Sequence, residues 1–352
     1  MSQVLSSLPR EWRLSMPAEW APHSTTWMSW PFDEEMWFGH LQEVRQEYSN
    51  LVRTLARFEP VQLIVRDEEA AASARELLSD VRNVTMHRIP LNDVWMRDNG
   101  PLFLLKSKDS PTDAPLVSFV NWNFNAWGEK YDWQLDNEVP KTLAEIFQWP
   151  RFDAPYVMEG GSLEINGEGL CITTEQCLLT PTRNPRLNKA DLEKILHDYL
   201  GFDQVIWLKQ GLEGDHTDGH IDTITRFANS TTVLTSVTPD RSDVNWERMQ
   251  ENLEILGRAR LKDGRNLRVV ELPLPDTKLF LADGTRLPAT YANFYMANGA
   301  VLVPQYADRK DAAALDVLRR AFPQHQVIGL NSRYIINGGG SFHCLTQQQP
   351  KV

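Results

Sequence analysis

One structural unit recurs along this chain and restricts the folds that the chain can adopt. In each copy a polar residue precedes a turn and two short β-prone runs, and these polar residues are Asp98, Glu159, His220 and Asn293. The Asn166-Gly167 dipeptide between two such runs is a strong hairpin signal. The interval from Asp98 to Glu159 is 61 residues, and the interval from Glu159 to His220 is the same. Equal intervals predict equal structural units.

A helical pattern and then a short apolar run follow each predicted hairpin. Apolar residues at helical spacing predict helices over residues 41–58, 68–78, 141–147, 188–199, 243–256 and 310–322. Short strands are expected over residues 61–65, 84–89, 156–158, 204–207, 268–271 and 326–330. The repeated unit is therefore ββαβ.

About five such units fit into 352 residues, and a ring around a central axis is their simplest arrangement. The hairpin heads would then point into one cleft. We expect an α/β fold in which residues 1–352 form a single domain. A doubly wound sheet is the alternative. It is disfavoured because no glycine-rich βα turn of the dinucleotide-binding or P-loop type is present, and residues 338–340 lie too near the C-terminus to begin such a unit.

Composition limits the compartment and the partners. The three cysteines, Cys171, Cys177 and Cys344, are too few and too scattered for a disulfide framework or a cysteine-rich zinc site. The first residues lack the pattern of a secretory signal, and no apolar stretch approaches the roughly 20 residues that a membrane span needs. We therefore expect a cytoplasmic protein. The net charge of −11 disfavours nucleic acid and anionic lipid as partners and permits a cationic substrate.

If the hairpin heads converge, one cavity contains a chemically coherent set of side chains. Its members are Asp98, Glu159, His220, Asp222, Asn293 and Cys344. The thiol of Cys344 can act as a nucleophile, and His220 can transfer protons near neutral pH. Asp98 and Asp222 can each accept the paired N–H groups of a planar guanidinium. In a strand, His220 and Asp222 would face the same side.

Several of these residues also have a purely structural interpretation. Cys344 can be a small buried hydrophobe that follows a bulge made by residues 338–340. Asp98 can be a turn residue, Glu159 a strand-end charge, and His220 a hydrogen-bonded core histidine. Their shared position at hairpin heads favours the functional interpretation. His343 is expected to point away from the face that Cys344 occupies, because neighbours in an extended chain alternate.

A metal site is a competing interpretation. Residues 215–222 contain two histidines and three aspartates, so a metal-dependent hydrolase could use His216 and His220. Gly219 and the β-branched run after it predict a loop and a strand here, rather than the helix that would place both histidines on one face. We therefore expect neither a metal nor an organic cofactor.

The chain as a whole resembles the agmatine deiminase branch of the Porphyromonas-type peptidyl-arginine deiminase family, within the guanidine-modifying, or amidinotransferase-like, superfamily. The motifs that carry the resemblance are Met16-Pro17-Ala18-Glu19-Trp20, Thr26-Trp27-Met28-Ser29-Trp30-Pro31, Trp95-Met96-Arg97-Asp98-Asn99-Gly100-Pro101, Glu159-Gly160-Gly161, Asp218-Gly219-His220-Ile221-Asp222, Asn293-Phe294-Tyr295 and Gly338-Gly339-Gly340 to Cys344. The family's fold is a pseudo-symmetric five-bladed ββαβ propeller of the pentein type, so the resemblance implies that fold here.

The resemblance also implies roles for individual residues. Cys344 resembles the family nucleophile, His220 the general acid–base, and Asp98 and Asp222 the carboxylates that bind guanidinium. Glu159 matches the carboxylate that supports the histidine. Further substrate contacts are expected from Trp95, Asp218, Asn293, Gly339 and Gly340, and Trp95 can equally be a structural residue. The chain departs from family members at Ser341-Phe342, at Thr223 and at Asp215-His216.

The implied activity is hydrolysis of agmatine to N-carbamoylputrescine and ammonia, through a covalent thiouronium on cysteine, in putrescine and polyamine biosynthesis. The implied partner is a small cationic guanidine, and a homodimer is left open as the assembly. Three other functions also stay open at this point. They are deimination of free or peptidyl arginine, metal-dependent hydrolysis through His216 and His220, and guanidine binding without catalysis.

Overall fold

The strands of this protein form five separate sheets. The computed structural model describes residues 3–352, and each of the five sheets in these residues contains at least one antiparallel and one parallel strand pair. The first sheet has the order β1-β5-β6-β7 and the second β10-β9-β8; the third and fourth are β11-β12-β13 and β14-β15-β16, and the fifth is β17-β2-β3-β4. The ββαβ unit that the repeat predicts is therefore found in each sheet.

The strands have the following bounds. They are β1 Leu14–Ser15, β2 His23–Ser29, β3 Val61–Val65, β4 Val84–Arg88, β5 Leu102–Lys106, β6 Val117–Asn123, β7 Arg151–Val157, β8 Glu164–Ile165, β9 Leu170–Thr174, β10 Gln204–Leu208, β11 Thr225–Asn229, β12 Thr232–Val237, β13 Arg268–Pro273, β14 Tyr295–Ala297, β15 Ala300–Gln305, β16 Gln326–Asn331 and β17 Gln347–Pro350. Most expected strands agree within a few residues. The strand expected at 156–158 is wrong in its start, since β7 begins at Arg151, where it pairs with β6.

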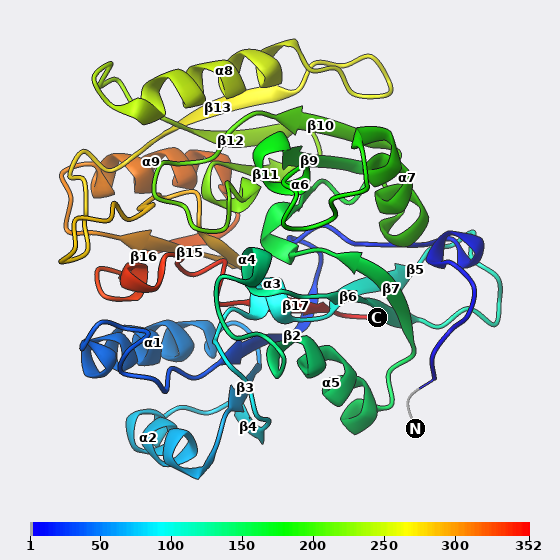
Figure 1. Ribbon diagram of the computed structural model, residues 1–352, viewed down its shortest axis with the longest axis horizontal. Coiled ribbons are helices and arrows are strands. Elements are labelled where there is room, and N and C mark those ends of the chain that lie inside the picture. The colour runs from blue at the N-terminus through cyan, green and yellow to red at the C-terminus, as the bar shows by residue number, and fades with distance from the viewer. Residues whose placement is uncertain (1–2) are drawn as a thin grey trace.

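Six longer helices connect the parallel strands. They are α1 Leu41–Leu55, α2 Glu68–Leu78, α5 Val139–Phe147, α7 Lys189–Leu200, α8 Val244–Arg258 and α9 Asp311–Ala321. Short helical turns complete the described chain: η1 Pro9–Trp12, α3 Met96–Asn99, α4 Ala126–Glu129, η2 Asp136–Glu138, η3 Gly160–Ser162, α6 Glu175–Leu178, η4 Ile221–Thr223 and η5 Ile335–Gly338. Figure 1 shows the longer helices around the outside and the short helices α3 and α4 near the middle of the molecule.

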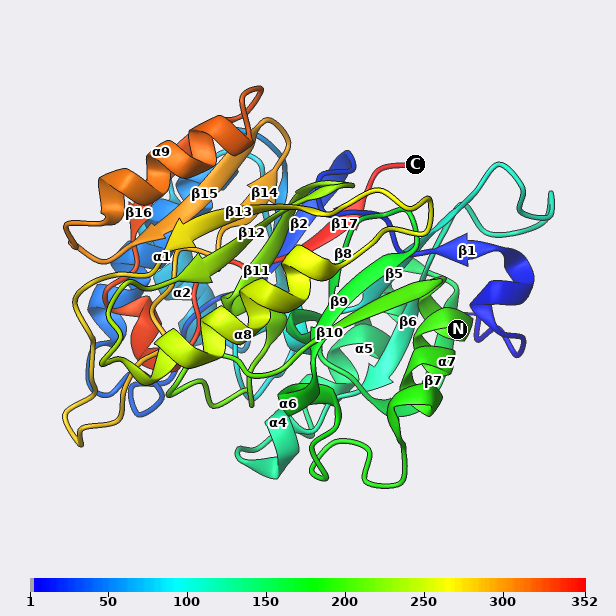
Figure 2. The same ribbon diagram turned by 90° about the horizontal axis from the view of Figure 1, so that it is seen from above.

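The two ends of the chain meet in the fifth sheet. Strand β17 near the C-terminus pairs antiparallel with β2 near the N-terminus, with Gln347 opposite Trp27. Figure 2 shows the red β17 beside the blue β2. The segment that follows the three glycines is therefore held in place by β2, which lies near the N-terminus. No helix within residues 3–352 is long and apolar enough to cross a membrane.

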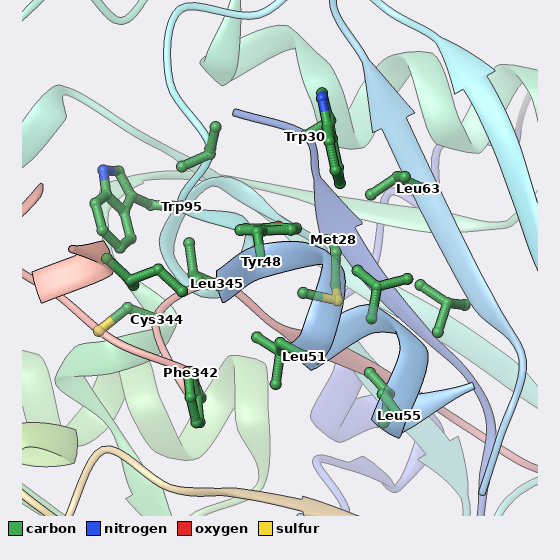
Figure 3. Close-up of a cluster of buried hydrophobic side chains, with 14 of the residues drawn as sticks. Met28, Trp30, Tyr48, Leu51, Leu55, Leu63, Trp95, Phe342, Cys344 and Leu345 are labelled. Carbon is green, nitrogen blue, oxygen red and sulfur yellow. The ribbon is translucent and has the colours of Figure 1, made fainter. Parts of the chain in front are cut away.

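One hydrophobic cluster supports the segment that carries Cys344. Phe342 and Leu345 are fully buried there beside Tyr48 and Leu51 of α1. Figure 3 shows Cys344 at the edge of this cluster, with its sulfur directed away from the side chains of α1. Burial of two large side chains on either side of the cysteine contributes on the order of 2 kcal/mol each. The core thus holds the loop in one position.

Candidate active site

Five hairpin heads, one from each sheet, supply the side chains of a single buried cluster. Asp98 lies in α3 before β5, and Glu159 precedes η3 and β8. His220 precedes η4 and β11, Asn293 precedes β14, and Cys344 precedes β17. All five are buried. The convergence expected from the repeat is therefore observed in the structure.

His220 lies between two carboxylates. Its Nδ1 is 3.8 Å from Asp98 Oδ1, and its Nε2 is 3.8 Å from Glu159 Oε2. Both distances exceed hydrogen-bond length, and neither ring nitrogen has a hydrogen-bond partner among the described residues. A fully buried imidazole without partners is costly unless a ligand or a water completes its bonds. The ring is therefore available for proton transfer to a bound molecule.

A glycine keeps the centre of the cluster open. A Cβ placed on Gly161 would lie 2.6 Å from His220 Nδ1, 2.8 Å from Asp98 Oδ1 and 3.1 Å from Asp222 Oδ2. The N–H of Gly161 also donates to Asp98 Oδ1 at 2.9 Å, and the indole N–H of Trp127 donates to Asp98 Oδ2 at 3.0 Å. Asp98 is thus held by two donors at the edge of a space that any larger residue would fill.

Glu159 is held by Arg183, which no sequence motif marks as a site residue. Arg183 Nε donates to Glu159 Oε1 at 2.8 Å, and both side chains are fully buried. The same guanidinium donates to the carbonyls of Trp127 and Thr217 at 2.8 Å each. Arg183 therefore occupies one oxygen of Glu159 and leaves Oε2 facing His220. Asn184-Pro185 predicts a turn at this place, but nothing in the local sequence indicates the contact between Arg183 and Glu159.

Asp218 is placed differently from the other expected substrate contacts. Its Oδ2 accepts from Arg183 at 2.5 Å and its Oδ1 accepts from Lys130 at 2.8 Å. It does not line the pocket described below. Asp218 therefore anchors Arg183 in the structure, and a direct contact between Asp218 and substrate stays a prediction.

Asn293 orders the turn that carries the thiol. Its Oδ1 accepts from the backbone N–H of Ser341 at 3.1 Å and of Cys344 at 3.3 Å. Its Nδ2 donates to Cys344 Sγ at 3.1 Å, while the thiol lies 3.6 Å from Asp222 Oδ2. One amide side chain thus fixes both the loop and the sulfur.

Two expectations about this region are wrong. Residues 342–345 form a turn rather than an extended chain, so His343 does not point away from the site. Its Nδ1 lies 2.6 Å from Asp222 Oδ2 and its Nε2 lies 2.7 Å from Glu19 Oε2. His220 and Asp222 do not share a strand either, because Ile221–Thr223 is a 3₁₀ turn before β11. At Ile221–Thr223 a local turn outweighs the β-branched pattern, and at residues 342–345 the turn follows hydrogen bonds from the backbone to the Asn293 side chain.

Burial and the charged neighbours in the cluster shift the pKa values of its side chains. Burial raises the pKa of the Cys344 thiol well above its usual value, and the charges of Asp222 and Asp98 raise it further. Burial disfavours the charged form of His220, but the neighbouring Asp98, Cys177 and Glu159 together outweigh burial and raise the pKa of that imidazole well above its usual value. Burial likewise opposes ionisation of Glu159, but Arg183 and His220 together outweigh burial and lower the pKa of that carboxyl. A cation entering between Asp98 and Asp222 would offset two of the causes that keep Cys344 protonated.

A pocket of about 510 Å³ adjoins the cluster on the side of the three glycines. Trp95, His216 and Gly339 are among its lining residues. Gly339 has φ +88°, and a Cβ there would collide with the ring of His216. A Cβ on Gly340 would lie 2.8 Å from the ring of Trp95 and 3.1 Å from Cys344 Sγ. The glycines therefore allow the loop to approach both the pocket wall and the thiol.

The pairing of His216 with His220 as metal ligands, which the competing interpretation would need, is not formed among the described residues. Among residues 3–352, the group of His, Cys, Asp and Glu side chains close enough to share one ion is Glu159, Cys177 and His220. His216 instead packs against the rings of Trp127 and Tyr131, with ring centroids 5.8 Å and 5.9 Å away. The loop around Gly219 separates the two histidines because it is not helical.

Replacing Gly161 with alanine is expected to reduce kcat/KM by at least about 100-fold, because the added methyl group occupies the space between His220, Asp98 and Asp222. The methyl group also overpacks a buried site, so we expect a loss of about 1–3 kcal/mol of stability, although the backbone is not strained because Gly161 is not among the residues with positive φ. The control is Gly257→Ala in α8, where a Cβ meets nothing within 4 Å. That variant should keep full activity and gain about 0.5–1 kcal/mol of stability. Full activity of Gly161→Ala would contradict the assignment of this space.

Comparison with known proteins places the chain in a family. The model of the Porphyromonas-type peptidyl-arginine deiminase family matches residues 15–350. The chain therefore belongs to this family, as its motifs indicate.

Individual relatives are similar over their whole length. The agmatine deiminase of Stutzerimonas stutzeri is 38% identical, with 99% of this chain and 98% of the relative covered. The agmatine deiminase of Medicago truncatula is 37% identical, with 99% of each chain covered. Among solved structures, agmatine deiminase of Enterococcus faecalis superposes with a TM-score of 0.92 at 30% identity over 100% of both chains. The protein thus has a mixed α/β single-domain fold similar to that of agmatine deiminases.

Proposed function

We propose that this protein is an agmatine deiminase, which hydrolyses agmatine to N-carbamoylputrescine and ammonia in putrescine biosynthesis. The observation that carries the proposal is the space at Gly161. There, an unpartnered imidazole and two carboxylates meet beside a thiol. A planar cation fits this set because each carboxylate can accept two N–H groups of a guanidinium. The full-length relatives named agmatine deiminase support the same choice.

The chemistry follows from the positions of the groups. Asp98 and Asp222 hold the guanidinium with its central carbon over Cys344 Sγ. The charge of the substrate favours the thiolate, so the thiol loses its proton to solvent when the substrate binds. The thiolate adds to the carbon, and protonated His220 delivers a proton to the nitrogen that leaves as ammonia. His220 then accepts a proton from water as the water attacks the thiouronium, and the collapse of this adduct restores the thiol and releases the ureido product. Glu159 stabilises the imidazolium form of His220 before the first proton transfer and after the second.

The substrate assay distinguishes this function from its alternatives. Purified protein is incubated separately with agmatine, free arginine and an arginyl peptide, and ammonia and ureido product are measured. We expect turnover of agmatine with equal amounts of both products. Faster turnover of arginine or of the peptide would move the assignment to the other deiminases, and binding without ammonia release would indicate a guanidine-binding protein.

The pH dependence of this reaction follows from Asp98. Burial raises the pKa of Asp98 to about 6, and Asp222 and Glu159 add to the effect against the opposing charge of His220. Below that pH the carboxyl is increasingly neutral and the guanidinium loses one charged partner. We expect kcat/KM for agmatine to fall as the pH drops below about 6, approaching tenfold per pH unit. A kcat/KM that stays constant from about pH 8 to pH 5 would contradict this role of Asp98.

The acidic wall of the pocket suits the distal amine of agmatine. Three carboxylates, Glu35, Asp93 and Asp283, line the pocket, whereas its Arg286 is paired with Asp243 at 2.7 Å and 2.8 Å. Asp93 is buried, and burial, reinforced by Asp136, raises the pKa of its carboxyl. A substrate ammonium would favour the ionised form of Asp93. Asp93 is therefore the proposed partner of the amine.

Asp93→Asn is expected to raise KM for agmatine about tenfold and to change kcat less than about twofold, since the amine lies far from the reacting carbon. For an alkylguanidine without the amine, the KM of Asp93→Asn should equal that of the wild type. Asp283→Asn is the control, because its exposed carboxylate is screened by solvent and should matter little. Equal effects on agmatine and on the alkylguanidine would rule out this contact.

The closed propeller, the cellular location and the oligomeric state are also proposals. We propose that the five sheets form one closed five-bladed propeller over residues 1–352, supported by the pairing of β17 with β2. A cytoplasmic location is supported by three buried free thiols, which suit a reducing compartment. The homodimer stays a prediction that sedimentation velocity can test.

A further inference from the structure

A second buried cysteine lies beside the proposed acid–base histidine. Cys177, Glu159 and His220 each offer one ligand atom, and these atoms lie within 4.8 Å of one another. Cys177 Sγ is 4.0 Å from Glu159 Oε2, which in turn is 3.8 Å from His220 Nε2. The mechanism proposed above uses Glu159 and His220 but has no role for Cys177.

The three side chains are held in place by other contacts. Cys177 lies in α6, whose first residues are capped by the side chain of Thr174. The hydroxyl of Thr174 also donates to the carbonyl of Gly219 at 2.6 Å, next to His220. Arg183 fixes Glu159 through Oε1 and leaves Oε2 directed at the histidine. The three ligand atoms therefore face one another without rearrangement of the backbone.

We propose that Glu159, Cys177 and His220 form a Zn²⁺ site whose occupation inhibits the enzyme. A thiolate, an imidazole and a carboxylate are the ligands that Zn²⁺ takes, and three protein ligands leave a fourth position for water. Zinc bonds of about 2.0–2.3 Å place ligand atoms roughly 3.3–3.8 Å apart, so side-chain shifts of about 0.5 Å suffice. The unpartnered Nε2 of the buried His220 supplies the lone pair in its neutral form.

The charges around the site favour a cation. Asp98 and Asp222 lie near His220 in addition to Glu159, and the opposing charge is that of Arg183. Zinc binding displaces one proton from the Cys177 thiol and one from the His220 imidazolium. Burial raises the pKa of the Cys177 thiol, so zinc must compete with a proton there. The affinity for Zn²⁺ should therefore increase as the pH rises.

Zinc would inhibit the enzyme because it would bind to Nε2 of His220. A zinc ion on Nε2 removes the lone pair with which His220 accepts a proton, and it adds positive charge where the cationic substrate must bind. The inhibition rests on the proposed function, whereas binding of the metal does not. The two can therefore be tested separately.

Cobalt replaces zinc for a spectroscopic test of binding. Chelator-treated protein is titrated with Co²⁺ alone, and the thiolate-to-cobalt charge-transfer absorption is recorded for the wild type and for three single variants. We expect the band in the wild type, in Cys344→Ala and in Cys171→Ser, which alters a core thiol of β9. Cys177→Ser should lose the band and bind Zn²⁺ at least about tenfold more weakly, as measured by competition with a chromophoric chelator.

The proposal depends on which cysteine variant lacks the charge-transfer absorption. A band that survives in Cys177→Ser and disappears in Cys344→Ala would assign the metal to the nucleophile and overturn the site. Absence of a band in the wild type would overturn it as well. If Cys177→Ser does not fold, anomalous scattering at the zinc edge from wild-type crystals gives the answer, with zinc expected about 2.3 Å from Cys177 Sγ. Inhibition of ammonia release by Zn²⁺ in the wild type is then measured on its own.

Discussion

Cys344→Ala is expected to lower kcat for agmatine by about 10⁵-fold, while the dissociation constant for agmatine changes less than about tenfold. The reason is that the sulfur forms the covalent bond of the reaction, whereas the carboxylates that bind the guanidinium come from other loops. Loss of a nucleophile in other hydrolases removes activity on this scale. Single-turnover ammonia release and calorimetric titration with agmatine measure the two quantities.

Cys171 provides the control. Cys171 lies in β9 and is fully buried, so Cys171→Ala should cost stability through a small cavity and leave turnover nearly unchanged. If Cys344→Ala kept even about a tenth of wild-type turnover, the thiol would not be the nucleophile. The cysteine would then have the structural role that its place at the edge of the α1 cluster permits.

Asp98→Asn is expected to lower kcat/KM for agmatine by about 10³-fold, through both a higher KM and a lower kcat. Asparagine keeps the shape of the side chain but removes the charge beside a buried cation, and removal of one partner of a buried ion pair costs about 3–5 kcal/mol. The asparagine NH₂ would also face either the indole N–H of Trp127 or the N–H of Gly161, which both donate to Asp98. Steady-state kinetics on agmatine gives both parameters.

A carboxylate away from the cluster separates this effect from general loss of charge. Asp198 in α7 pairs with Lys194 and Arg10 near the surface, so Asp198→Asn should change kcat/KM less than about twofold. A change confined to KM in Asp98→Asn would show that the carboxylate binds the guanidinium without helping to align it over the sulfur.

Local sequence patterns predicted the elements well. The helix over residues 68–78 and the strand over 61–65 have the expected bounds, because amphipathic spacing and β-branched runs act locally. The recurring hairpins also predicted that Asp98, Glu159 and His220 would meet. The pairing of β17 with β2 cannot be derived from spacing alone, since the two strands lie more than 300 residues apart in the chain.

No local sequence motif indicates the roles of Arg183 and Cys177, which were not among the predicted site residues. Arg183 in a loop forms an ion pair with Glu159. Cys177 lies in the short helix α6, and its sulfur is close to His220 although the two residues are far apart in the sequence. His343 was assigned to the wrong side because an extended chain was assumed where the structure has a turn. Its contacts with Asp222 and Glu19 show that the residue next to the thiol positions a carboxylate. Such contacts depend on tertiary packing, which the spacing of residues does not encode.

Trapping of the covalent intermediate tests most directly that Cys344 attacks the guanidinium of agmatine. The reaction is quenched with acid during steady turnover, and the intact protein and its proteolytic peptides are weighed by mass spectrometry. We expect the wild type to gain the mass of agmatine less ammonia, on the peptide that contains Cys344, and Cys344→Ala to gain nothing. Steady ammonia release without an adduct on any cysteine, or an adduct located on Cys177, would contradict the proposed mechanism.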